Sequence, residues 1–99
     1  MNQERVTNMV GLAQRAGQLV TGTDFVLAAI ADHRARLVLL GSDASANLTK
    51  KINDKGSYYD VPVASPLSVA ELSAAIGHQR SVVAVADAGF AQALSKLLT

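Results

Sequence analysis

Few side chains in this chain are placed to do acid–base, nucleophilic or metal chemistry together. The two histidines, His33 and His78, lie far apart, each at or just beyond the end of a predicted helix. Most of the aspartates occupy positions typical of helix caps or turns: Asp24, Asp43, Asp54, Asp60 and Asp87. No two acids have the spacing of a catalytic pair, and the absence of cysteine excludes a disulfide scaffold, a thiolate zinc site and a cysteine nucleophile. We therefore expect no catalytic residue, no metal and no cofactor.

A phosphate site is the second chemistry to consider. The stretch "LLGSDAS", residues 39–45, reads as a strand, a glycine and a helix start, where α/β proteins bind phosphates with backbone N–H groups. Neither G-x-G-x-x-G nor G-x-x-x-x-G-K-[ST] occurs in the chain. We therefore interpret this stretch as an ordinary loop. A small-molecule or nucleotide-binding enzyme stays an alternative function, but the sequence favours it least.

Polyanion binding is the third possibility. Several basic residues lie near predicted helix ends: Arg15, Arg34, Arg36, Lys50, Lys51 and Lys55. The formal net charge of only +1 predicts no strong overall field, so a nucleic-acid contact would depend on where these cations lie. Tyr58 and Tyr59 could stack on bases, although we expect at least one to pack on the core. The alternative is that these lysines only form a charged, solvated surface and bind no polyanion.

The spacing of apolar residues predicts helices alternating with strands. We expect helices over about 4–16, 22–33, 44–57, 69–76 and 88–98, and strands over 18–20, 35–42, 61–64 and 81–87. Two of these strands are apolar throughout, so helices should cover both faces of the sheet. Ninety-nine residues allow one domain, 1–99. The expected fold is α/β, a three-layer α/β/α sandwich with a mixed sheet of about four strands.

Capping residues are predicted at four helix starts. Thr21, with Asp24 three residues later, is the expected N-cap of the second helix. Ser42 or Asp43 would cap the third, Ser68 with Glu71 forms a capping box for the fourth, and Asp87 would cap the last. Pro62 indicates either an edge strand or the start of a strand.

The location of the protein is also an expectation from sequence. No apolar run is long enough to span a bilayer, and "MNQERVTNMV" lacks the pattern of a signal peptide. We expect a cytoplasmic protein without membrane or DNA contact. Few apolar positions are expected at the surface, which favours a monomer.

Five stretches in order cover nearly the whole chain: "GLAQRAGQLVTGTDFVLAAI", "ARLVLLGSDASANLTKKI", "YYDVPV", "AIG" and "VVAVADAGFAQAL". Together they resemble the bacterial branch of the ribosomal L-seven-Ae family, which contains kink-turn RNA-binding proteins of the large ribosomal subunit. The resemblance implies an α/β/α sandwich. It also implies a non-enzymatic protein that binds structured, kink-turn-like RNA, with ribosomal RNA as one candidate.

The resemblance places an RNA site where a short strand turns into the second helix. Kink-turn binders have Gly-Thr-Asn-Glu there, followed by a Lys one helical turn along. Here the turn is Gly22-Thr23, with Asp24 in the Asn place, Phe25 in the Glu place and Ala28 in the Lys place. Ionised Asp accepts hydrogen bonds but donates none, and one lost base-edge pair is worth about 1–3 kcal/mol by analogy with DNA. We expect reduced affinity or reduced kink-turn selectivity.

Further RNA contacts are expected around this turn and in the loop before the fourth helix, which the family uses as an apolar wedge against flipped bases. These positions are Arg15, Gln18, Thr21, Arg34, Asp43, Lys50, Pro66, Leu67 and Val69. The second hypothesis is a protein-interaction adaptor that kept the fold but lost specific RNA binding. The replacements Phe25 and Ala28 favour it.

Overall fold

The computed structural model describes residues 3–98, in which helices and strands alternate as the apolar spacing predicts. The helices are α1 (Gln3–Arg15), α2 (Thr23–Ala31), α3 (Ala46–Tyr58), α4 (Val69–Ile76) and α5 (Ala88–Leu97). The strands are β1 (Leu19–Thr21), β2 (Leu37–Leu40), β3 (Val63–Ala64) and β4 (Val82–Val85).

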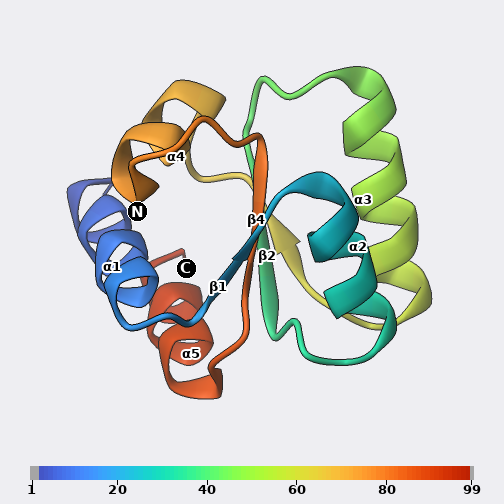
Figure 1. Cartoon of the computed structure of the whole chain (residues 1–99), viewed down its shortest axis with the longest axis horizontal. Helices are drawn as coiled ribbons and strands as arrows, with labels where there is room; N and C mark the ends of the chain where they lie inside the picture. Colours follow the sequence, from blue (N-terminus) through green and yellow to red (C-terminus); the bar gives the residue numbers. More distant parts are fainter. Residues whose placement is uncertain (1–2, 99) are drawn as a thin grey trace.

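The sheet is mixed, with strand order β1-β4-β2-β3. Strand β4 is antiparallel to both β1 and β2, and β2 is parallel to β3. Strands β1, β2 and β3 therefore run in one direction and end at the same edge of the sheet. We call the residues that follow them, 22–24, 41–45 and 65–68, the upper edge, which lies toward the top of Figure 1. The lower edge is formed by residues 16–18, 32–36 and 86–87.

Two apolar layers hold the helices against the sheet. Alternate residues of a strand point to opposite faces, so Leu37 and Leu39 join one core cluster while Val38 and Leu40 join the other. Helices α1, α4 and α5 cover the first face, and α2 and α3 cover the second (Figure 1). The prediction of a three-layer α/β/α sandwich is confirmed, as is the edge position of β3.

The predicted caps hold at two helix starts. Ser68 and Glu71 form the capping box of α4, and Asp87 caps α5 by accepting a hydrogen bond from the Phe90 amide. Both caps are local in sequence, because each side chain accepts from an amide only three residues away.

The other predicted caps are wrong. Thr21 belongs to β1, where it pairs with Val83, so the helix begins one residue later at the N-cap Gly22. Ser45, rather than Ser42 or Asp43, caps α3. Helix α2 also ends earlier than predicted, at Ala31 and not at His33. His33 has a positive φ of 65°, which is outside the helical region.

None of the helices formed by residues 3–98 has the length and apolar character needed to cross a lipid bilayer.

Candidate functional site

The start of α2 lies on the upper edge and presents free backbone amides. Gly22 has φ 96° and ψ 141°, a conformation that only glycine adopts readily. The first bond of the helix runs from the Val26 amide to the Gly22 carbonyl at 2.9 Å, and no side chain caps the helix. The amides of Thr23, Asp24 and Phe25 therefore have no acceptor in the part of the chain that the structure describes.

The side chains around this turn are small or open to solvent. Phe25 is 70% exposed, although it is one of the largest apolar side chains in the molecule. Asp24 and Ala28 are exposed, and Thr23 is half-buried. A Cβ built on Gly22 would meet only the Phe25 ring, at 3.7 Å from Cδ2. The turn therefore offers three amides, one carboxylate and one aromatic ring to a molecule approaching from outside.

The two neighbouring loops of the upper edge are bonded to each other. The Ser42 amide donates to the Leu67 carbonyl at 2.9 Å, and the Val69 amide donates to Asp43 Oδ1 at 2.7 Å. A Cβ on Gly41 would clash with the Val69 side chain and lie 3.0 Å from its backbone nitrogen. Gly41 thus permits close packing of the loops, and the space expected for a phosphate at "LLGSDAS" is filled by α4.

Two residues that we predicted as RNA contacts have partners within the chain. Leu67 is only 2% exposed and belongs to the core, so the prediction that it forms part of a surface wedge is wrong. The carboxylate of Asp43 is exposed, but one oxygen is taken by the Val69 amide. Pro66 and Val69 are half-buried beside Leu67 and keep part of their apolar surface open.

Three other predicted contacts lie away from the turn. Arg15 ends α1, while Gln18 and Arg34 lie on the lower edge. The Gln18 carbonyl accepts from the Ala86 amide at 2.9 Å. The three residues of β1 lie between Gln18 and Gly22, so these two residues are separated by about 13 Å of extended chain. The structure does not bring this group next to the start of α2.

Two ion pairs set the local electrostatics on the α2 and α3 side. Lys50 donates to Asp54 at 2.7 Å, and this hydrogen bond raises the pKa of Lys50. Arg34 donates to Asp32 at 2.7 Å, and this bond lowers the pKa of Asp32. Both pairs are well exposed, so solvent screens them and they stabilise the fold little. Within residues 3–98, no cluster of acids and histidines could hold a metal ion.

Comparison with known proteins decides the family. Residues 4–95 match the model of the "Ribosomal protein L7Ae/L30e/S12e/Gadd45 family". The chain belongs to this family. The "RNA-binding protein YlxQ" of Enterococcus faecium is 41% identical over 97 residues, which are 98% of this chain and 94% of the relative. The protein of the same name from Bacillus subtilis is 50% identical over 91 residues, 91% of each chain.

Two solved structures share the fold of this chain. A Bacillus halodurans protein described as having unknown function superposes with a TM-score of 0.91 at 40% identity, over 95% of this chain and 96% of that one. The "Giardia lamblia 15.5kD RNA binding protein" superposes with a TM-score of 0.82 over 96% of this chain and 82% of its own. At 15% identity, the Giardia likeness establishes a shared fold alone.

Proposed function

We propose that this family member is a non-enzymatic RNA-binding protein that recognises structured, kink-turn-like RNA through the start of α2. Ribosomal RNA is the natural source of such folds for a member of a ribosomal protein family. Support comes from the two YlxQ relatives, which are named RNA-binding proteins and align with more than nine-tenths of this chain.

The observation that carries the proposal is the uncapped first turn of α2. Its free amides suit the phosphate oxygens and the acceptor atoms of base edges. Gly22 keeps the approach open, because it has no side chain to hold the RNA at a distance. Sharply bent RNA exposes both unstacked bases and phosphates, so such a turn can contact both at once.

Two side chains give the turn its own chemistry. Phe25 is 70% exposed and can stack on an unpaired base. The carboxylate of Asp24 is exposed and can accept a hydrogen bond from a guanine amino group, but cannot donate one. With Ala28 in place of a lysine, residues 23–31 of α2 contain no Lys or Arg to offset the phosphate charge. We therefore expect kink-turn RNA to bind more tightly than a plain duplex, but with modest selectivity.

The test is a fluorescence anisotropy titration of three labelled RNAs. They are a kink-turn duplex, the same RNA with its tandem G·A pairs replaced, and a straight duplex of equal length. The kink-turn RNA should bind most tightly, and its affinity should fall only gently with added salt because few cations contribute. Equal binding to all three RNAs would contradict kink-turn recognition.

The Phe25→Ala variant tests whether the RNA binds at the start of α2. Loss of one stacking ring should weaken kink-turn binding by about fivefold or more. Leu12→Ala is the matched control, since Leu12 is also an exposed apolar residue, at 45%, but lies on α1 across the sheet. If no RNA binds, while protein partners are captured in the presence of ribonuclease, the adaptor hypothesis replaces the proposal.

A further inference from the structure

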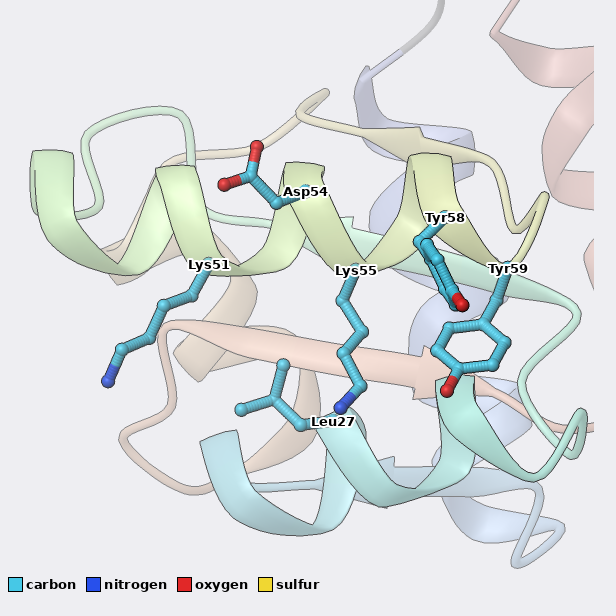
Figure 2. Close-up of a pocket in the computed structure, with 6 residues that line it drawn as sticks. All are labelled: Leu27, Lys51, Asp54, Lys55, Tyr58 and Tyr59. Atoms are coloured by element: carbon cyan, nitrogen blue, oxygen red, sulfur yellow. The ribbon is translucent and has the colours of Figure 1, made fainter.

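A groove of about 680 Å³ runs between α2 and α3 and is not part of the upper edge. Both helices begin at the upper edge, so they are parallel and the groove extends from that edge toward the lower one (Figure 2). Leu27 forms its side on α2, one turn after the start of the helix. The residues from α3 and its C-cap are Lys51, Asp54, Lys55, Tyr58 and Tyr59.

The groove carries excess positive charge. Its one carboxylate, Asp54, is already bound by Lys50 at 2.7 Å. Lys51 and Lys55 form no ion pair within residues 3–98; the Lys55 ammonium lies 5.9 Å from the centre of the Tyr59 ring. Figure 2 shows the Lys55 side chain reaching across the groove toward Leu27, while Lys51 extends outward. Two cations are therefore available to an anionic ligand.

An open aromatic ring lies at the far end of the groove. Tyr58 is 80% exposed, the largest exposed fraction of any large apolar or aromatic side chain in residues 3–98. Its ring meets Tyr59 edge to face, with centroids 4.8 Å apart. Tyr59 is held in place because it packs on the core and contacts the His33 ring at 5.8 Å. Tyr58 thus has a fixed neighbour, while most of its own surface faces solvent.

We propose that this groove binds an unpaired segment of RNA, with a base stacked on Tyr58 and phosphates near Lys51 and Lys55. Aromatic rings interleaved with cations are the usual means of holding single strands. Bases inside a duplex are already stacked, so only an unpaired base can use the ring. The eight residues from Lys51 to Tyr58 span about 10 Å of helix, which suits a short segment of RNA.

RNA fits the groove better than a peptide does. An apolar peptide would leave two unpaired lysines beside it and would find only Leu27 as an aliphatic contact. The inference rests on the proposed function, because the same RNA would leave the start of α2 and continue along the groove. The experiment must therefore separate the two contacts.

Anisotropy titrations with two kinds of RNA make that separation. The first is a blunt kink-turn duplex, and the second is the same duplex with four unpaired adenosines at either end. The extension should tighten binding by about fivefold or more, and an abasic extension of equal length should recover only the phosphate part of this gain. Lys51→Gln with Lys55→Gln should reduce the gain and its salt dependence, by a slope of about 1.4 for two phosphates of a single strand.

Tyr58 provides the decisive variants. Tyr58→Ala should reduce the gain from the adenosine extension to that of the abasic extension. Tyr58→Phe should keep the full gain, and neither variant should alter binding of the blunt RNA. The unfolding temperature should stay unchanged, since the side chain is almost fully exposed. A full gain in Tyr58→Ala, or no gain in the native chain, overturns the proposal and leaves the groove to a protein partner.

The two proposals fail in different ways. Binding of the extended RNA that depends on Tyr58, without binding of the blunt RNA, supports the groove and contradicts kink-turn recognition at α2. Binding of the blunt RNA that depends on Phe25, without any effect of the extension, does the reverse. If neither RNA binds, both proposals are overturned.

Discussion

The starts of α2 and α4 lie on the same edge of the sheet but satisfy their backbone amides in opposite ways. At α4, Glu71 accepts from the Ser68 amide at 2.8 Å, Asp43 from the Val69 amide at 2.7 Å, and Ser68 from the Glu71 amide at 3.1 Å. At α2, no side chain caps the helix. Side chains of the chain itself thus accept from the Val69 and Glu71 amides in the first turn of α4, whereas the first turn of α2 has room for an outside acceptor.

This difference costs the fold little. Glycine in place of a serine or aspartate N-cap loses only a few tenths of a kcal/mol. Helix α2 is held chiefly by its buried face, where Val26, Ala29 and Ile30 have no exposed surface. Packing against the sheet therefore fixes the helix, and its first turn is left available for binding. The comparison of the two helix starts can be tested by substitutions at each end of the sheet.

The largest effect is expected from Gly22→Ala. A Cβ would fit the space, since its nearest neighbour is the Phe25 ring at 3.7 Å, but the φ of 96° is strained for alanine. We expect a loss of about 1–3 kcal/mol in unfolding free energy, measured by urea denaturation. RNA affinity should fall by about tenfold if relief of the strain turns the amides by an amount worth one hydrogen bond.

Gly17→Ala is the control for that variant. Gly17 also has a positive φ, 72°, and a Cβ added there would meet nothing within 4 Å, but the residue lies on the lower edge. It should lose about 1–2 kcal/mol of stability and retain full RNA affinity. Equal loss of affinity in both variants would show that binding follows overall stability and not the α2 turn.

Removing the cap of α5 should, unlike Gly22→Ala, lower stability without lowering RNA affinity. Asp87→Ala deletes the carboxylate that accepts from the Phe90 amide at 2.8 Å, at the start of α5 on the lower edge. The unfolding free energy should fall by about 1 kcal/mol, and RNA affinity should not change. A loss of RNA affinity in this variant would mean that RNA also contacts the lower edge, which contradicts a site confined to the start of α2.

The order of elements and the layers could be predicted from sequence, because both follow from local apolar spacing. The runs 35–42 and 81–87 have no polar face, so helices must cover both sides of the sheet. The capping box at Ser68 and the cap at Asp87 are equally local and were predicted correctly.

The wrong predictions depend on contacts between distant residues. Thr21 has the sequence of an N-cap, but pairing with Val83 extends β1 by one residue and moves the cap to Gly22. From the sequence alone, Asp43 and Leu67 are expected to be available for RNA contact. Their roles are decided by the meeting of two loops, in which Asp43 binds an amide 26 residues away. The α2–α3 groove was missed for the same reason, since Leu27 and Tyr58 come together only in the fold.

Adding a cation beside the α2 turn should produce a moderate gain. Ala28 is exposed one turn after Asp24, at the place where the kink-turn binders carry lysine. Ala28→Lys should tighten structured RNA by about threefold to tenfold and steepen the salt dependence by a slope of about one. Ala74→Lys, at an exposed position on α4, adds the same net charge elsewhere. Equal gains in the two variants would mean that net charge, rather than placement, controls binding.

The smallest effect is expected at the opposite end of α2 itself. There backbone amides of residues 32–34 donate to the last carbonyls of the helix. The Asp32 carboxylate in turn accepts from the Arg34 amide at 3.1 Å and from Arg34 Nε at 2.7 Å. The hydrogen bond from the Arg34 side chain lowers the pKa of Asp32 from its ordinary value of 3.8. A lowered pKa means that the unfolded chain takes up the proton first. The stabilisation is therefore present above that ordinary value and is lost as the pH falls through the lower, folded-state value.

Asp32→Asn should abolish this acid-pH dependence, measured as unfolding temperature between neutral pH and the acid range. The two proteins should differ slightly at neutral pH, because the pair is exposed, and should converge in acid. RNA affinity at neutral pH should be unchanged, because Arg34 lies on the lower edge. A tighter complex would instead mean that releasing Arg34 adds an RNA contact. The RNA would then reach both ends of α2, and the C-terminal end would belong to the binding surface as well.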